Sequence, residues 1–249
     1  MAAGAPRHGL ARVLSKRGVC SRTEAARWIT AGRVSVDGRV VRDPEHPIAA
    51  NSRRRIAVDG QDIDQAMERL YVLLNKPRGL VTTANDERGR DTVYRCFESA
   101  QLHGQPLPWL APVGRLDQAS EGLLLFCNDP AWAARVTDPQ SGPDKTYHVQ
   151  VDTIPDAALL HQLAMGIEHE GEKLQAKSAT LLRAGERNAW LEIVLDEGRN
   201  RQIRRLLAAF DIAVLRLVRV AIGDLALGDL PKGQWRWLTP AEVAQLREG

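Results

Sequence analysis

The sequence predicts an α+β protein in two parts, a small basic segment followed by a larger body on a mixed, largely antiparallel sheet. Strand-like and helix-like stretches follow one another without the regular alternation that builds a parallel sheet. A polar stretch at residues 61–69 reads as a linker with no strand pattern. Charge is also divided unevenly. Residues 1–60 carry twelve Lys and Arg against five Asp and Glu, a net +7, and residues 61–249 carry 22 against 26, a net −4.

Within the basic part, two short helices precede two turns. Leu10, Val13 and Leu14 form a helical stripe that Gly18 ends, and Ser21 to Glu24 has the spacing of a capping box for a second helix that Gly32 ends. Asp37-Gly38 between apolar runs predicts a hairpin, and the strand 55–58 ends in a second Asp-Gly.

The body contains both strands and helices. We expect strands at 70–74, 123–127, 146–151 and 190–195, and helices at 155–165 and 200–210. The unalternating apolar run from Leu123 to Cys127 is typical of a strand buried on both faces.

Composition limits the class of protein. No apolar run is long enough for a membrane span, and the first residues lack a signal-peptide core, so we expect a cytoplasmic protein. Cys20, Cys96 and Cys127 are far apart and predict reduced thiols. The histidines show no ligand spacing, so we predict no metal and no cofactor. A basic segment on an acidic body favours a polyanionic partner over a merely solubilising surface.

Asp117 is the candidate catalytic residue. It lies in the run Gly114-Arg115-Leu116-Asp117-Gln118-Ala119-Ser120-Glu121-Gly122, on a loop that leads into the buried strand, where a side chain can be held rigidly toward a cleft. Taken alone, such an Asp more often caps a turn.

Five further segments occur in a recognisable order. They are Leu74-Asn75-Lys76-Pro77-Arg78-Gly79, Lys145-Thr146-Tyr147, Gly198-Arg199-Asn200-Arg201-Gln202-Ile203-Arg204-Arg205, Leu217 to Gly223 and Leu230 to Gly233. With the Asp117 run, they resemble the RNA pseudouridine synthases that modify ribosomal RNA. The stretch from Leu10 to Asp59 resembles an S4-type RNA-binding domain. The resemblance implies an S4-type domain at 8–60, a linker at 61–69 and a catalytic domain at 70–249.

The resemblance assigns roles to three residues. Asp117 attacks the ribose or removes a sugar proton, a choice that the sequence leaves open. Arg204 is implied as the arginine that favours the ionised form of Asp117. Tyr147 is implied to receive the extruded base, although an alternating strand could equally aim it into the core.

Basic residues near these segments are candidate contacts to ribosomal RNA, with the large subunit slightly favoured. Each could equally be a solvated side chain. They are Arg12, Lys16, Arg17, Arg22, Arg27 and Arg33 in the basic part, and Lys76, Arg78, Arg115, Lys145, Arg199, Arg201 and Arg205 in the body.

Two other classes of protein remain as rivals. A glycoside hydrolase needs two opposed carboxylates, and Glu121 is the only acid close to Asp117 in sequence. A non-catalytic S4-type RNA-binding or ribosome-assembly protein leaves the ordered Asp, Tyr and Arg unexplained. Glu121 also departs from the Thr or Ser of many relatives, which affects the expected local contacts to substrate. His148 is expected to face away from Tyr147, and the protein is expected to be monomeric.

Overall fold

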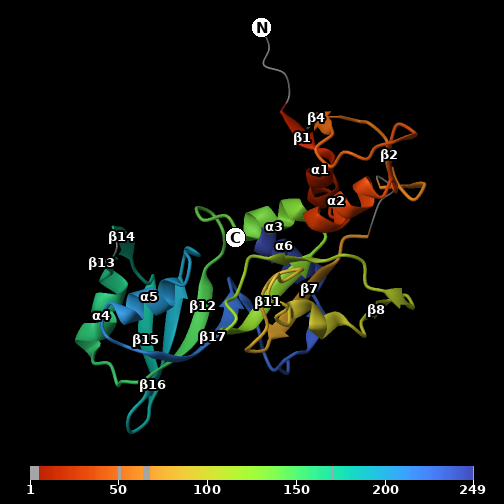
Figure 1. Ribbon diagram of the computed structural model, residues 1–249. Helices are drawn as coiled ribbons and strands as arrows, with labels where there is room; N and C mark the ends of the chain where they lie inside the picture. The colour runs from red at the N-terminus through yellow and green to blue at the C-terminus, as the bar shows by residue number, and fades with distance from the viewer. Residues whose placement is uncertain (1–5, 50–51, 64–67, 170, 249) are drawn as a thin grey trace. The chain divides into compact units, whose positions relative to one another are not determined.

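The computed structural model describes residues 6–49, 52–63, 68–169 and 171–248 (Figure 1). The chain forms two compact units, which are described separately. The first comprises Met1–Leu70, Ser99–Ala111 and Cys127–Pro130, and the second comprises Tyr71–Glu98, Pro112–Phe126 and Ala131–Gly249.

The first unit begins with two short helices, α1 (Leu10–Lys16) and α2 (Arg22–Thr30). The Ser21 side chain accepts a hydrogen bond from the backbone N–H of Glu24 at 3.1 Å, which confirms Ser21 as the N-cap of α2. Leu10, Leu14 and Ile29 are fully buried between the helices and the adjacent strands.

Short strands complete the first unit. A sheet in the order β3-β2-β5-β6 contains β2 (Val34–Val36), β3 (Arg39–Val40), β5 (Ile56–Val58) and β6 (Gln61–Asp62), and a pair contains β1 (Arg7–Gly9) and β4 (Pro47–Ala49). A separate hairpin consists of β8 (Gln101–Leu102) and β9 (Gln105–Pro106).

Both Asp-Gly turns have the expected left-handed backbone. Asp37 and Gly38 have φ values of 50° and 79°, as a tight hairpin turn requires. The second turn leads into β6, which pairs with β5. The expectation that residues 61–69 contain no strand is therefore wrong at Gln61–Asp62, because the Asp59-Gly60 turn returns the chain to the sheet edge. Residues 64–67 of the predicted linker lie outside the described residues.

The second unit is built on one mixed sheet, as expected for an α+β body. In the described residues its strand order is β15-β16-β12-β17-β11-β7-β19, with β10 beside β11 and β18 beside β17. The strands are β7 (Tyr71–Lys76), β10 (Ala111–Val113), β11 (Glu121–Cys127), β12 (Lys145–Val151), β15 (Ser178–Ala184), β16 (Ala189–Leu195), β17 (Val214–Ile222), β18 (Leu225–Ala226) and β19 (Trp235–Trp237). Strands β11 and β17 are parallel, and β12 is antiparallel to both β16 and β17.

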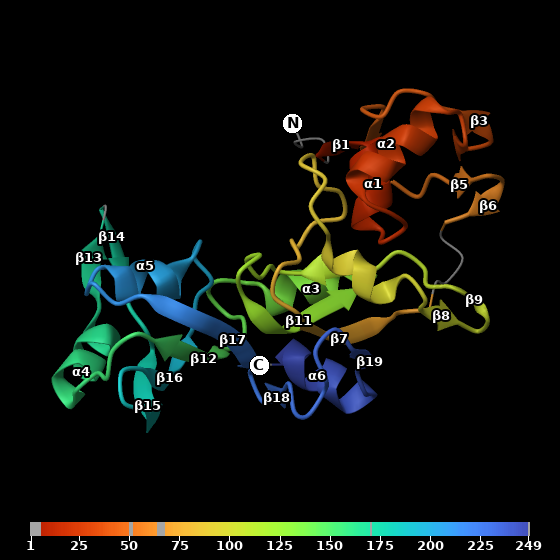
Figure 2. The same cartoon turned by 60° about the horizontal axis from the view of Figure 1, so that its bottom comes forward.

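Helices and a small hairpin accompany the sheet. They are α3 (Pro130–Val136), α4 (Ala157–Met165), α5 (Gln202–Ala208), α6 (Pro240–Glu248), the 3-10 helix η1 (Val93–Phe97), and the hairpin of β13 (Ile167–His169) and β14 (Glu172–Leu174). Figures 1 and 2 show α5 beside strands β12, β16 and β17. The indole N–H of Trp132 in α3 donates to the Val243 carbonyl in α6 at 3.0 Å.

The principal elements of the body are confirmed with shifted ends. The strand expected at 70–74 runs from Tyr71 to Lys76, and every residue of β11 is buried, as its unalternating sequence predicts. The helix expected from Pro155 begins at Ala157, because the Asp156 side chain caps it by accepting from the Leu159 N–H at 2.8 Å. The helix expected at 200–210 spans only Gln202–Ala208.

Three properties of the described residues bear on the class of protein. The cysteines are free thiols, and Cys20 and Cys127 are buried. No helix in the described ranges is long and apolar enough to cross a membrane. No group of His, Cys, Asp or Glu among those residues could hold a metal ion.

Candidate active site

Asp117 lies on a loop between β10 and β11, as expected, and backbone and side-chain hydrogen bonds fix this loop. The Ser120 N–H donates to the Asp117 carbonyl at 3.0 Å. The Thr82 hydroxyl donates to the Leu116 carbonyl at 2.7 Å and accepts from the Leu116 N–H at 3.3 Å. The loop is therefore held at both sides of Asp117 before the chain enters the buried strand.

A cavity of about 510 Å³ opens beside this loop. Its walls include Asp117, Tyr147, Lys145, Arg201 and Arg204. Tyr147, on β12, is buried and lines this cavity. His148 is not among the lining residues and lies 3.4 Å from the Glu192 carboxylate on β16, so it faces away from Tyr147 as expected. The structure thus brings all three residues with implied catalytic roles to one cavity.

The arginine that pairs with Asp117 in the structure is Arg201. Its guanidinium Nη1 lies 3.6 Å from the Asp117 carboxylate Oδ2. Arg204, which the family resemblance implied as this partner, donates instead to the backbone carbonyls of Val214 and Ala119 at 3.4 and 3.3 Å. Burial first, and the charge of Arg201 second, hold the pKa of Arg204 below its usual value, and the charge of Asp117 opposes them. Both cations are thus close enough to act on Asp117 electrostatically.

The start of helix α5 places Arg201 toward Asp117. Arg201 is the N-cap residue and has a left-handed backbone, with φ of 49° and ψ of 32°. The buried Gln202 donates to the Gln175 carbonyl at 3.0 Å and to the Glu197 carboxylate at 2.6 Å. Gln202 therefore anchors the turn that carries Arg201, and sequence reasoning gave Gln202 no role.

Lys76 does not contact solvent, so its prediction as an RNA contact is wrong in this structure. Its side chain is 0% exposed, and its ammonium donates to the Ser120 carbonyl at 2.8 Å and to the Pro77 carbonyl at 3.0 Å. Burial lowers the pKa of Lys76 to about 8, against the opposing charges of Glu121 and Asp117. Lys76 therefore connects strand β7 to the Asp117 loop through the Ser120 carbonyl.

Glu121 is buried in an ion-pair network. Its carboxylate accepts from Arg216 at 2.8 and 3.0 Å and pairs with Lys232. Burial alone would raise the pKa of Glu121, but the hydrogen bonds from Arg216 and Lys232 lower it to about 2. Glu121 is not among the residues that line the cavity, so its departure from the Thr or Ser of many relatives changes an internal contact. It also cannot serve as the second carboxylate of a glycoside hydrolase.

The remaining basic residues predicted in the body divide into two groups. Arg78 and Arg115 are exposed; Arg115 and the half-buried Lys145 line the cavity, and the charge of Arg78 acts on Arg204. Arg199 pairs with Glu197 at 2.8 Å, and Arg205 pairs with Glu172 at 2.8 Å. The second group is engaged within the protein.

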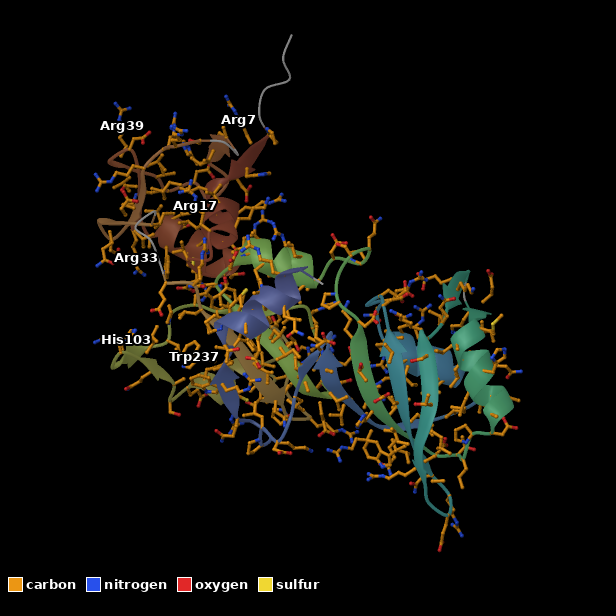
Figure 3. The ribbon with its side chains drawn as sticks, turned by 180° about the vertical axis from the view of Figure 1, so that it is seen from behind. Arg7, Arg17, Arg33, Arg39, His103 and Trp237 are labelled. Atoms are coloured by element: carbon orange, nitrogen blue, oxygen red, sulfur yellow. The ribbon has the colours of Figure 1, made fainter. Side chains whose placement is uncertain are left out.

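The basic residues of the first unit divide in the same way. Arg22, Arg27 and Arg33 pair with Glu45, Glu24 and Asp59, and Arg33 also lies over the Trp28 ring at 4.9 Å. Arg17 is half-buried. Arg12 and Lys16 are exposed and have no ion pair with another described residue. Figure 3 shows Arg7, Arg33 and Arg39 at the outer edges of this unit.

One further cavity residue, Arg219, was outside the predicted set. It is 6% exposed and lines the cavity from β17. The only sequence signal for it was its place in the segment Leu217 to Gly223, within a strand that reads as apolar.

A mixed sheet carries Asp117, Tyr147, Arg201 and Arg204 around one cavity, and a small basic module precedes it, as expected for an RNA-modifying class of protein. Family models agree. The RNA pseudouridylate synthase model matches residues 70–209, and the S4 domain model matches residues 9–53. The chain therefore belongs to the RNA pseudouridine synthase family, in the branch that carries an N-terminal S4 domain.

Individual relatives match over nearly the whole chain. "Ribosomal large subunit pseudouridine synthase B" of Bacillus subtilis (strain 168) is 36% identical over 240 residues, which cover 96% of this chain and 95% of the relative. The protein of the same name in Shigella flexneri is 36% identical over 96% of this chain and 82% of its own length. A crystal structure described as a pseudouridylate synthase aligns with a TM-score of 0.64 at 29% identity, covering 96% of this chain and 99% of that chain.

Proposed function

We propose that this protein isomerises a specific uridine of large-subunit ribosomal RNA to pseudouridine in the cytoplasm, acting as a monomer. The observation that carries the proposal is the convergence of Asp117, Tyr147, Arg201 and Arg204 on one cavity. The names of the Bacillus subtilis and Shigella flexneri relatives support the choice of the large subunit.

The geometry supports roles for Asp117, Arg201, Arg204 and Tyr147. Asp117 supplies the carboxylate that acts on the ribose, as nucleophile or as base. Arg201 places a positive charge 3.6 Å from this carboxylate, and Arg204 adds a second positive charge nearby. The Tyr147 ring lies in the wall that would receive the extruded base. No external reactant is consumed, because the product is an isomer of the substrate.

The S4-type module supports recognition of RNA outside the cavity. Arg12 and Lys16 are exposed on α1 without an ion pair to another described residue, so they could neutralise phosphates. The proposal includes an S4-type domain at 8–60, extended to include β6, and a catalytic domain at 70–249. A non-catalytic S4-type protein would have no use for a carboxylate held beside an arginine in a cavity of about 510 Å³.

The test is to map pseudouridines in ribosomal RNA from cells with and without the gene, and then to incubate the purified protein with the RNA that lacks the modification. The proposal expects one or a few large-subunit positions to lose pseudouridine without the gene and to regain it in vitro. A change confined to small-subunit RNA would correct the target. No change in any RNA would contradict the proposed function.

A further inference from the structure

Arg219 is a buried cation in the cavity that the mechanism above does not use. Strand β17 holds it between two neighbours, because Gly122 of β11 and Tyr147 of β12 are its partners in the sheet. Its Nε donates to the Leu123 carbonyl at 2.8 Å. A Cβ at position 122 would lie 2.2 Å from the Arg219 carbonyl oxygen, so only glycine permits this close approach of the strands. The backbone of Arg219 is therefore fixed on both sides.

The hydrogen bonding of Arg219 is incomplete. Among the described residues, three buried side-chain atoms have no hydrogen-bond partner: Ser120 Oγ, Arg204 Nε and Arg219 Nη2. All three residues line the same cavity. Buried polar groups without partners are costly and therefore rare in native proteins, and they cluster where a ligand completes them.

The charge of Arg219 is also uncompensated. No ion pair joins it to a carboxylate within the part of the chain that the structure describes. The half-buried Lys145 is close to it, since burial first and the charge of Arg219 second hold the pKa of Lys145 below its usual value. A buried and a half-buried cation in the lining of one cavity favour a ligand that presents acceptor oxygens and takes up negative charge.

Because Arg219 is buried, we expect its ligand to be a base of the RNA and not a phosphate. RNA phosphates remain hydrated at the surface, where the exposed Arg115 and Arg201 lie at the edge of the cavity. An extruded base enters the cavity, whose floor also contains the apolar side chains of Leu217 and Ile222. Uracil presents two carbonyl oxygens to a guanidinium, whereas cytosine presents an amino donor in place of O4.

We propose that Arg219 donates a hydrogen bond to a carbonyl oxygen of the target uracil and stabilises the base as it leaves the ribose. The inference rests on the proposed function. When the C1′–N1 bond breaks, its electron pair stays on N1 and is delocalised onto O2 and O4, so the bond from Arg219 strengthens in the transition state. The uracil anion then uses this electron density to form the new bond between C5 and C1′. C5 then loses its proton to water, and N1 takes one up.

The test combines a protein change with a substrate change. Single-turnover rates are measured for the full-length wild type, Arg219→Met and Arg219→Lys on a synthetic RNA fragment that contains the mapped target. The target is uridine, 2-thiouridine or 4-thiouridine, because sulfur is a weaker acceptor than oxygen. Arg183→Met is the control, since Arg183 lies on β15 over the Trp190 ring and outside the cavity.

The wild type is expected to react more slowly with one of the two thio-substituted RNAs. Arg219→Met should lower the rate on uridine by about 100-fold, with little change in KM, and should no longer distinguish that thio RNA from uridine. If Arg219→Met does not fold, as thermal unfolding would show, the same comparison with Arg219→Lys decides the question. A purely structural role for Arg219 would leave the ratio of the thio and uridine rates unchanged.

Two failures are distinguishable. An active wild type whose thio sensitivity does not depend on residue 219 overturns the role of Arg219 and leaves the proposed function intact. A wild type that forms no pseudouridine on any ribosomal RNA overturns the proposed function and the role of Arg219 together.

Discussion

The Arg201 guanidinium lies 3.6 Å from the Asp117 carboxylate, and this ion pair joins the first residue before helix α5 to the loop before strand β11. The pair is partly open to solvent, since 51% of the Arg201 side chain and 36% of that of Asp117 are exposed. Its direct contribution to stability is therefore small, about 1 kcal/mol or less. Its value lies in placing a positive charge beside the carboxylate that we propose acts on the ribose.

Asp117→Asn should abolish the formation of pseudouridine and leave folding nearly unchanged. The substitution removes the charge and keeps the shape, and a carboxylate that acts as nucleophile or base typically contributes at least about 100-fold to the rate. The measurement is single-turnover pseudouridine formation, with RNA affinity and thermal unfolding followed in parallel. Appreciable turnover by a folded Asp117→Asn protein would remove Asp117 from the catalytic role.

Arg201→Asn separates the electrostatic role of Arg201 from its place in the fold. Asn adopts a left-handed backbone more readily than Arg and is a favoured N-cap, so the change should keep or raise stability by up to about 1 kcal/mol. Turnover should nevertheless fall, because the cation beside Asp117 is lost. Stability is measured by thermal or urea unfolding, and turnover under single-turnover conditions.

Arg204→Gln is the matched comparison for Arg201→Asn. Arg204 bonds to the carbonyls of Ala119 and Val214, so its loss should loosen the Asp117 loop as well as remove charge. We expect a loss of both stability and turnover. If only Arg204→Gln lowers turnover and Arg201→Asn is fully active, the ion pair in the structure has no role in the reaction.

Glu121→Gln should destabilise the protein by about 1.5 kcal/mol, because it weakens the charge-assisted hydrogen bonds from Arg216 and Lys232, whose partly exposed side chains remain hydrated. The pKa of Glu121 is lowered from 4.5 to about 2 in the folded protein. Its stabilising effect is thus fully present above about pH 4.5 and is lost as the pH falls toward 2. Urea unfolding across this range should show a weaker loss of stability for Glu121→Gln than for the wild type. Identical pH profiles would contradict the ion-pair account.

The double variant Arg12→Gln, Lys16→Gln should weaken binding to ribosomal RNA and flatten its salt dependence. If both residues contact phosphates, the slope of log affinity against log salt should fall by roughly 1.4 to 1.8. Arg33→Gln is the control, since the Arg33 guanidinium is already paired with Asp59 and stacked on Trp28. If the double variant and Arg33→Gln have equal effects, ion pairing within the S4-type module does not determine which cations contact RNA.

Local patterns predicted the elements well, because the interactions that form them are local in sequence. The Ser21 cap, the Asp37-Gly38 turn and the buried run of β11 each depend on neighbouring residues. The arrangement of the site, in contrast, depends on contacts between residues that are distant in sequence. Lys76 reads as a surface cation, and only the fold brings the Ser120 carbonyl to its ammonium.

The ion pair of Asp117 with Arg201, in addition to the nearby Arg204, was missed for a related reason. A helix from Asn200 would place both arginines, three residues apart, on one face. The helix in fact begins at Gln202, and the left-handed Arg201 directs its side chain separately toward Asp117. Arg219 was missed because its position between Gly122 and Tyr147 is set by the sheet.

The central claim is that Asp117, in this cavity, converts a uridine of large-subunit ribosomal RNA to pseudouridine. The most direct measurement is to add the purified wild type or Asp117→Asn to unmodified large-subunit ribosomal RNA and to map pseudouridine at single-nucleotide resolution. We predict that the wild type modifies a defined uridine, that Asp117→Asn modifies none, and that both bind the RNA. Pseudouridine formed equally by the two proteins, or by neither, would contradict the account.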